Sequence, residues 1–369
     1  MSFALAQQVA DAALYQGYIL YPYRASSVKN QGRWQFGVVA PRRYTEAGHD
    51  DEACAMQTEC LVDTQGAAEV DVRVRFLQLQ TRRVEAADAA RDEGFRAAGE
   101  FLVDGQAIRA WDEAVERTLD IPGVVLADLP AGGRSWPVTV GGGLETEVVR
   151  NEAGQITGRI RRERQPIDGH VWIESERIAS VVKLRVRIDN ESAWPGAAEA
   201  GRPEALHRAL LGAHTLLAVR HGVFVSLLEP PRWAEGLAAT CRQIGTWPVL
   251  VGEPGQPEVL LSAPIILYDY PAVAAESPGD LFDATEIDEI LTLRVMTLTD
   301  DERREARTID ARAREIVERS DEISAELFGR LHGAIRDLQA SPDQEEAGEH
   351  AKGGDARAPT VPPDGESRA

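Results

Sequence analysis

Alternating apolar and polar residues mark several β-strands between residues 18 and 270. In residues 70–80 (VDVRVRFLQLQ) valines alternate with arginines, and residues 181–190 (VVKLRVRIDN) repeat the pattern. A period of two predicts strands with one buried and one solvent-exposed face. Other apolar runs flank the turn sequences NEAG and EPGQP, which predict antiparallel hairpins. The full set of predicted strands is 18–24, 34–40, 54–62, 70–80, 138–150, 155–164, 181–190, 223–228, 247–251, 259–261 and 265–270.

Helical spacing of apolar residues appears elsewhere in the chain. Within the body it predicts helices at residues 3–14, two across 82–120 that break at Asp104-Gly105, and one at 203–219. Farther along, Asp283 and Glu286 stand at capping-box spacing and predict the start of another helix. A long charged helix is predicted from residue 299 to about 338, with a narrow apolar stripe at Ile309, Ile316, Ile323, Leu327 and Leu331.

These patterns predict an α+β fold. Residues 1–270 are expected to form an antiparallel sheet or β-sandwich-like body with inserted helices, with a possible sub-boundary near 121–137. A loop and a helical C-terminal arm are expected over 271–338. Residues 339–369 contain little to bury and are expected to form a disordered acidic tail.

Composition narrows the classes of partner. The chain of 369 residues carries 40 Lys and Arg against 60 Asp and Glu, a formal net charge of −20. Nucleic acid and anionic membrane surfaces both require dense basic contacts, so this charge disfavours them. No apolar run approaches the roughly 18 residues that span a bilayer, and the first residues lack the basic stretch of a signal peptide. A cytoplasmic protein without membrane insertion is expected.

The three cysteines, Cys54, Cys60 and Cys241, are expected to be reduced thiols. Three is too few and odd in number for a disulfide framework. The spacing Cys54-x₅-Cys60 is looser than that of zinc sites. His207, His214 and His221 recur every seven residues, which on a helix leaves successive imidazoles about 10 Å apart, too far to share a metal ion. Neither a metal nor a cofactor is therefore expected.

Basic and aromatic residues interleave at one place in this acidic chain, and seven residues there are candidate binding residues: Tyr21, Tyr23, Arg24, Lys29, Asn30, Arg33 and Trp34. Arginine and aromatic side chains together can receive an anionic ligand or an acidic protein surface. The alternative is a hairpin whose aromatic residues cap the core and whose loop is solvated.

The pattern Ile-Leu-Tyr-x-Tyr occurs twice, at residues 19–23 and 266–270. If the two predicted strands lie together, Tyr21 is near Tyr268 and the basic hairpin meets the acidic loop that follows. Tyr268, Asp280 and Asp283 are therefore added to the candidate binding residues.

Carboxylates are dense in residues 269–289, namely Asp269, Glu276, Asp280, Asp283, Glu286, Asp288 and Glu289. Paired carboxylates can serve acid–base catalysis or hold a divalent cation. The competing interpretation is structural, because acidic residues stabilise a helix N-terminus. Gly141-Gly142-Gly143 has neither the phosphate-loop nor the dinucleotide pattern and is expected to form a turn.

The segments ILYPYRASSVKNQGRWQFG and SPGDLFDATEIDEILTLR resemble a family of uncharacterised proteins encoded in gene clusters for NiFe-hydrogenases of the actinobacterial, oxygen-tolerant type. The resemblance extends over about residues 17–326. It implies an accessory role in hydrogenase biogenesis, with hydrogenase subunits as possible partners, and it implies no catalytic residues.

Three functional hypotheses follow. The leading one is a cytoplasmic, non-catalytic binding or assembly protein that contacts a protein partner. The first alternative is a metal-dependent hydrolase that uses the carboxylates of residues 269–289. The second is a structural subunit that self-associates through the predicted C-terminal helix.

Overall fold

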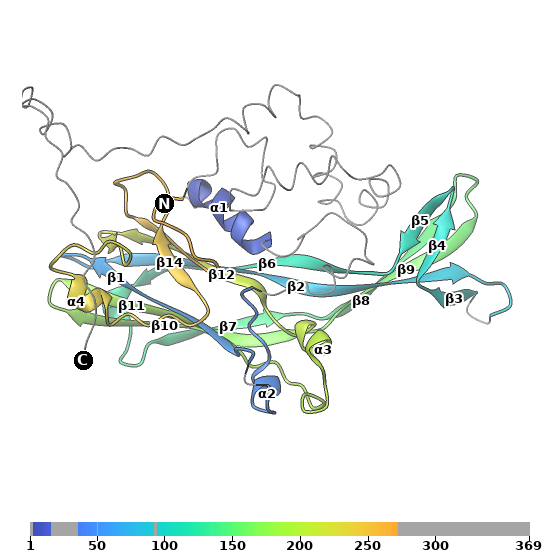
Figure 1. Ribbon diagram of the computed structural model, residues 1–369, viewed down its shortest axis with the longest axis horizontal. Coiled ribbons are helices and arrows are strands. Elements are labelled where there is room, and N and C mark those ends of the chain that lie inside the picture. The colour runs from blue at the N-terminus through green and yellow to red at the C-terminus, as the bar shows by residue number, and fades with distance from the viewer. Residues whose placement is uncertain (1–2, 16–35, 50, 92–93, 272–369) are drawn as a thin grey trace, which may run out of the picture.

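A computed structural model describes residues 3–15, 36–49, 51–91 and 94–271 and shows two antiparallel sheets packed face to face (Figure 1). The smaller sheet has the strand order β13 (Val223–Val225), β1 (Ala55–Asp63), β11 (Val181–Asn190), β10 (Ile167–Ile178), β7 (Arg134–Val140). The larger sheet has the order β14 (Trp247–Leu250), β15 (Val259–Ala263), β12 (Leu211–Arg220), β2 (Glu69–Ala87), β9 (Ile156–Arg164), β8 (Gly143–Arg150). The predicted antiparallel β-rich body is confirmed, but few helices accompany it in the described residues, so the α+β prediction holds only in part.

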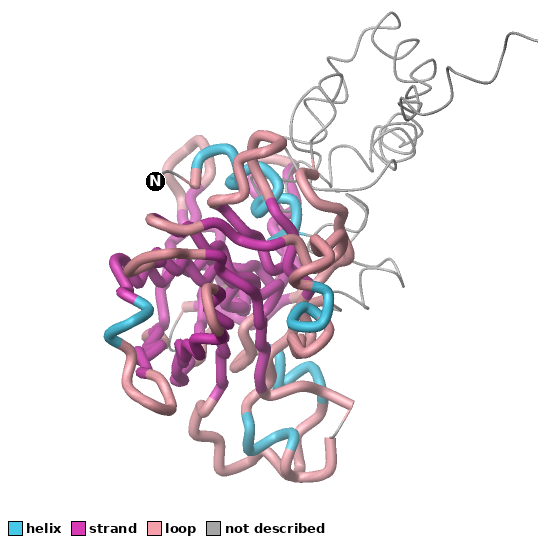
Figure 2. The backbone as a smooth tube through the Cα atoms, turned by 90° about the vertical axis from the view of Figure 1, so that its left-hand side faces the viewer, coloured by secondary structure: helices cyan, strands magenta, loops and turns pink. Residues whose placement is uncertain are grey.

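Helices are short and lie around the outside of the strands (Figure 2). They are α1 (Ala4–Tyr15), α2 (Arg42–Thr45), α3 (Arg202–Leu206) and α4 (Glu235–Ala238), with a 3-10 turn at Leu126–Asp128. The helix α1 packs on the outer face of the larger sheet, where its Ala6, Val9 and Ala10 meet Leu216 and Leu261. None of the helices within the described ranges is long and apolar enough to cross a membrane.

The core lies between the two sheets and is made by the alternating residues of facing strands. Val70, Val72, Val74 and Phe76 of β2 meet the inner side chains of β11, which are Val182, Leu184, Val186 and Ile188. All are nearly inaccessible to solvent. Burial of this apolar surface stabilises the sandwich, and the period of two on each strand makes it possible.

The strand β2 is 19 residues long and extends beyond the sandwich. Its first half pairs with β12 on one edge, and its second half pairs with β9 on that same side. Along the opposite edge run β6 (Trp111–Val125) and β3 (Phe95–Ala98). We call the projecting part the arm: the second half of β2 with β3, β8, β9 and the hairpin of β4 (Glu100–Val103) and β5 (Gln106–Arg109), on the right in Figure 1.

The hairpin β4–β5 covers the arm through one aromatic side chain. Phe101 is 7% exposed and packs with Val84 of β2 and Ile160 of β9. Gly158 of β9 makes this approach possible, because a Cβ atom there would lie 2.5 Å from the Phe101 ring and 2.6 Å from the carbonyl oxygen of Glu85. The absence of a side chain at Gly158 therefore leaves room for the Phe101 ring, whose contacts hold the hairpin on the arm.

Replacing Gly158 by alanine is expected to displace the hairpin. Overpacking of this kind costs about 1–3 kcal/mol, and the loss should be local. Hydrogen exchange of residues 100–109 should accelerate while that of β11 stays slow. Gly99→Ala is the matched control, since a Cβ atom there meets nothing within 4 Å. Equal acceleration in both variants would contradict the packing role of Gly158.

The two helices predicted across residues 82–120 are wrong. This stretch contains the end of β2 and the strands β3, β4, β5 and most of β6. Its Ala, Glu and Arg residues favour helices intrinsically, but pairing with β2 overrides that preference. The pairing runs from Arg82 opposite Trp111 to Glu69 opposite Val125. Between the strands the guanidinium of Arg73 donates to Asp120 at 2.6 Å.

The helix predicted at residues 203–219 is also mostly wrong. Only α3 is helical, and β12 begins at Leu211. Nine of its ten residues are buried, so the strand shows a continuous apolar run in place of alternation. Such a run has the same appearance in a buried helix. As a result, His207 lies just after α3, His214 lies on β12, and His221 lies in the turn before β13 with φ of 59°.

The apolar strand predicted at residues 265–270 does not form. Only the preceding residues up to Ala263 are in β15, and Ile266 and Tyr268 are 78% and 87% exposed. Asp269 accepts a hydrogen bond from the Leu250 N–H at 2.8 Å, and the Tyr270 N–H donates to the Leu250 carbonyl at 2.7 Å. These two bonds hold the segment against the edge of β14. Tyr270 adopts a positive φ of 54° there.

The other local predictions agree better with the structure. The strand at residues 181–190 is β11, and the turn sequences NEAG and EPGQP connect the hairpins β8–β9 and β14–β15. Residues 54–62 and 70–80 lie within or beside β1 and β2. The predicted C-terminal helical arm beyond residue 271 and the acidic tail lie outside the described residues.

Candidate functional site

Of the predicted binding residues, only Tyr268 lies within the described residues. Its side chain is 87% exposed and stands beside the edge strand β14. The basic and aromatic group and the two acidic residues fall outside the described ranges: Tyr21, Tyr23, Arg24, Lys29, Asn30, Arg33, Trp34, Asp280 and Asp283. The proposed meeting of Tyr21 with Tyr268 therefore stays a prediction.

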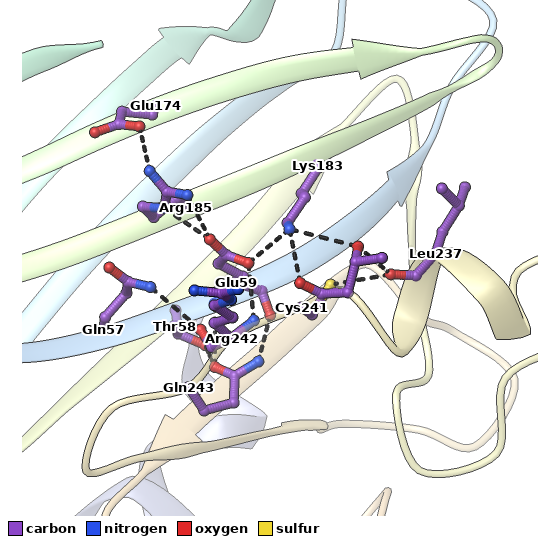
Figure 3. A network of polar contacts seen from close by, with 11 residues as sticks. Gln57, Thr58, Glu59, Glu174, Lys183, Arg185, Leu237, Cys241, Arg242 and Gln243 are labelled. Carbon is purple, nitrogen blue, oxygen red and sulfur yellow. Dashed lines mark hydrogen bonds and ion pairs between the residues drawn. The ribbon is translucent and has the colours of Figure 1, made fainter. Parts of the chain in front are cut away.

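A charged network on the outer face of the smaller sheet was not predicted. Alternation along β11 turns Lys183, Arg185 and Arg187 away from the core, and Glu59 of β1 lies opposite Arg185. The Glu59 side chain is fully buried and forms ion pairs with Lys183 Nζ at 2.8 Å and Arg185 at 2.7 Å. Arg185 also binds Glu174 of β10 at 2.6 Å (Figure 3).

The chain from Thr240 to Ile244 covers Glu59 and follows the edge of β1. The Arg242 N–H donates to the Glu59 carboxylate at 2.8 Å, and Lys183 Nζ donates to the Thr240 carbonyl at 2.9 Å. Gln243 donates to the Glu59 carbonyl at 2.7 Å and accepts from the Glu59 N–H at 3.1 Å (Figure 3). Side chain and main chain of Glu59 thus fasten this segment to the sheet.

Burial by itself would raise the pKa of Glu59. The hydrogen bonds from Lys183, the Arg242 N–H and Arg185 outweigh that effect and lower the pKa below its ordinary value. The carboxylate is therefore ionised at neutral pH and has both oxygens occupied. A general base needs a free lone pair within reach of a substrate, so the arrangement suits a structural clamp better than catalysis.

An open hollow of about 390 Å³ lies next to this network. Thr45, Glu52, Cys54, Arg187 and Ile244 are among its lining residues. Arg187 pairs with Asp189 at 3.0 Å, and Arg42 contacts the same carboxylate at 2.9 Å. The hollow therefore brings the Cys54 thiol close to paired charges.

The cysteines are free thiols, as predicted. Burial, with a smaller effect of Cys241 and Glu59, raises the pKa of the Cys60 thiol, which packs in the core. Burial also raises the pKa of Cys241 to about 11. Within the described ranges no three His, Cys, Asp or Glu side chains are grouped so that they could hold a metal ion.

A ladder of polar side chains runs across the inner face of the arm. Gln80 of β2 donates to Glu113 of β6 at 2.7 Å and accepts from Arg164 of β9. Arg162 of β9 bridges Glu113 at 3.0 Å and Glu147 of β8 at 2.7 Å. The ladder ends at Glu145 and Glu147, on the outermost strand of the sheet, where Glu145 pairs with Arg164.

Strand β8 at the end of this ladder is exposed along nearly its whole length. It pairs with β9 on one side, and no strand of the described chain pairs with its other side. Unpaired N–H and C=O groups on such an edge can accept a further strand. The edge of β8 is therefore the described surface best suited to contact another chain.

Sequence reasoning missed both of these features for an identifiable reason. The alternation in residues 181–190 places three cations on one face, and that signal was visible. Lys183 and Arg185 pair with Glu59, which lies more than 120 residues away in the sequence. Residues 240–244, which cover Glu59, belong to a third segment. The turn NEAG predicted the β8–β9 hairpin, but no local pattern shows which of its strands ends the sheet.

Comparison with known proteins does not assign the chain to a family. No model of a known protein family matches the chain, and no curated protein matches it.

Proposed function

We propose that the protein is a cytoplasmic, non-catalytic binding or assembly protein that contacts its partner through the arm. The observation that supports this most is the exposed edge of β8 at the end of a projecting sheet. Ion pairs that join β9 to β6 and to β8 brace the arm, so a partner would meet a preformed surface. The resemblance of residues 19–37 and 277–294 adds a setting, NiFe-hydrogenase biogenesis, and hydrogenase subunits as candidate partners.

The hydrolase alternative has less support among the described residues. Asp269 is the one carboxylate of the acidic stretch that the structure describes. It accepts hydrogen bonds from the Ser226 hydroxyl at 2.5 Å and the Leu250 N–H at 2.8 Å. One oxygen therefore bonds the end of β14 and the other bonds the residue after β13, which is a structural role. Stoichiometric bound metal that is lost on Asp280→Ala or Asp283→Ala would favour the hydrolase over the binding protein.

Affinity capture from the native host tests the proposal. The tagged full-length protein is expected to recover a specific protein partner at near-stoichiometric amount, with hydrogenase subunits as the first candidates. Gly158→Ala, which displaces the hairpin of the arm, should reduce recovery, and Gly99→Ala should not. Recovery of no specific partner would contradict the assembly function.

Self-association is the other competing function. It rests on the predicted stripe from Ile309 to Leu331, which lies outside the described residues. A mass measurement of the full-length protein separates it from the proposal. A homo-oligomer that dissociates when Ile316 and Ile323 become charged would support the structural-subunit alternative.

A further inference from the structure

The strands that end a sheet differ in how well they are protected against pairing. Among the described strands, β3, β4, β5, β13 and β14 have four residues or fewer. The short edge β14 and the longer edge β7 contain Pro248 and Pro137, which cannot donate to a new strand. In β6 Pro122 lies near the end of the strand, and residues 111–121 contain no proline. The edge of β14 also carries Asp269 and Tyr270, hydrogen-bonded to Leu250. Strand β8 has eight residues and no proline.

The two faces of β8 differ in chemistry. Register with β9 places Leu144, Thr146 and Val148 on one face, and Leu144 and Val148 are 53% and 47% exposed. The other face carries Glu145 and Glu147, whose side chains are 61% and 59% exposed. Each carboxylate binds one arginine through a single oxygen, Glu145 through Oε1 and Glu147 through Oε2. The second oxygen of each accepts no hydrogen bond within the described chain.

A second copy of β8 fits this edge poorly. In antiparallel pairing, directly opposed residues lie on the same face, so Glu145 and Glu147 face the same positions of the added strand. When two copies of β8 pair antiparallel, the three registers centred on these residues place Glu145 opposite Glu145, Glu145 opposite Glu147, or Glu147 opposite Glu147. Like charges directly opposite each other destabilise a pair of strands. Lysine or arginine at the opposed positions would stabilise it for the same reason.

We infer that β8 accepts an extended segment of a partner protein as an added strand, and that this segment alternates basic with apolar residues. The inference rests on the proposed binding function and names the chemistry of its partner. Basic side chains of the segment would reach the free oxygens of Glu145 and Glu147. Its apolar side chains would cover Leu144 and Val148, while its main chain pairs with the open edge of β8.

Peptide binding to the full-length protein tests this inference. The probe is a labelled, acetylated eight-residue peptide in which lysine alternates with valine or threonine, followed by fluorescence anisotropy. One control peptide has glutamate for each lysine, and another has the same composition with the lysines in one block. The second control is needed because a protein of charge −20 attracts any basic peptide. The alternating lysine peptide should bind about tenfold more tightly than either control.

Matched variants locate the contact. Glu145→Gln with Glu147→Gln should remove the tenfold preference, while Glu176→Gln with Glu199→Gln, which changes charge equally on exposed residues elsewhere, should keep it. The bound peptide should also slow hydrogen exchange of residues 143–150. Equal binding of the alternating and block peptides, equal losses in both double variants, or protection outside residues 143–150 would each overturn the inference.

Affinity capture separates this inference from the function on which it rests. If the Glu145→Gln and Glu147→Gln double variant recovers the native partner as well as the unchanged protein does, the edge inference fails and the assembly function stands. If the lysine peptide protects residues 143–150 but no partner is recovered from the host, the edge inference stands and the assembly function fails.

Discussion

Replacing Glu59 by glutamine is expected to lower the free energy of unfolding by about 2–4 kcal/mol. Removing one partner of a buried ion pair typically costs about 3–5 kcal/mol, because the remaining charge loses its compensation. A smaller loss is expected for Glu59, because the side chains of Lys183 and Arg185 are 14% and 39% exposed and can regain water. Denaturant unfolding followed by tryptophan fluorescence measures the difference.

Glu174→Gln is the matched control for the Glu59 variant. It removes the other carboxylate on Arg185, but from a side chain that is 34% exposed, so a loss of about 0–1 kcal/mol is expected. The two variants should also differ locally. Only Glu59→Gln should accelerate hydrogen exchange of residues 240–244, because only Glu59 holds that segment. Equal losses in both variants would contradict the clamp.

Stability is expected to fall by about 3 kcal/mol as the pH is lowered from about 6.5 to about 4, through one imidazole. Burial lowers the pKa of His214 to about 4, and the nearby positive charge of Arg75 also lowers it. The imidazole Nδ1 is paired with the Gly212 carbonyl at 3.0 Å, and Nε2 is buried with no hydrogen-bond partner. Arg75 itself pairs with Asp11 at 2.5 Å and with Glu116 at 2.6 Å, and neither carboxylate is bonded to His214.

The sign of this effect follows from proton uptake. Between about pH 6.5 and pH 4 the unfolded chain binds a proton at His214 that the folded chain does not bind, so unfolding becomes easier as pH falls. Below about pH 4 both states are protonated and this contribution levels off. Glu59, Asp71 and Glu85 have lowered pKa values, so their contributions are lost only at lower pH, as the pH falls through those values.

The His214→Gln variant isolates the effect. The free energy of unfolding, measured by urea denaturation at several pH values, should lose most of its slope between pH 6.5 and 4 in this variant. A smaller slope should remain, because burial also lowers the pKa of His207. His170→Gln is the control, because it removes a half-exposed histidine bound to Glu191 and leaves His214 in place. An unchanged slope in His214→Gln would show that another group controls the acid response.

The elements that were predicted correctly are specified by patterns within their own short stretches of sequence. In β11 the alternation of valine and leucine with lysine and arginine matches the inner and outer faces residue by residue. The hairpin β8–β9 follows from the turn Asn151–Gly154, where the Gly154 N–H donates to the Asn151 carbonyl at 2.9 Å. Both signals act over a few residues, and distant parts of the chain do not alter them.

The elements that were predicted wrongly depend on distant partners. Strand β6 is rich in helix-forming residues, and it is extended because β2 offers it a long pairing edge. Strand β12 is buried by α1 on one side and by the core on the other, which removes the alternation that identifies a strand. The properties of Glu59 likewise depend on residues 240–244, which cover it. Those of the β8 edge depend on the lack of a second neighbouring strand in the described chain.

By itself the sequence determined the acidic charge, the antiparallel β-body and the positions of its regular hairpins, because these follow from composition and from periodicity along a short stretch. Only the tertiary structure decided that residues 82–120 form strands, that Glu59 is a buried clamp for residues 240–244, and that β8 ends the larger sheet. The physical reason is that burial, ion pairing and edge position are properties of the contacts between segments. Those contacts join residues that are tens to hundreds of positions apart in the chain.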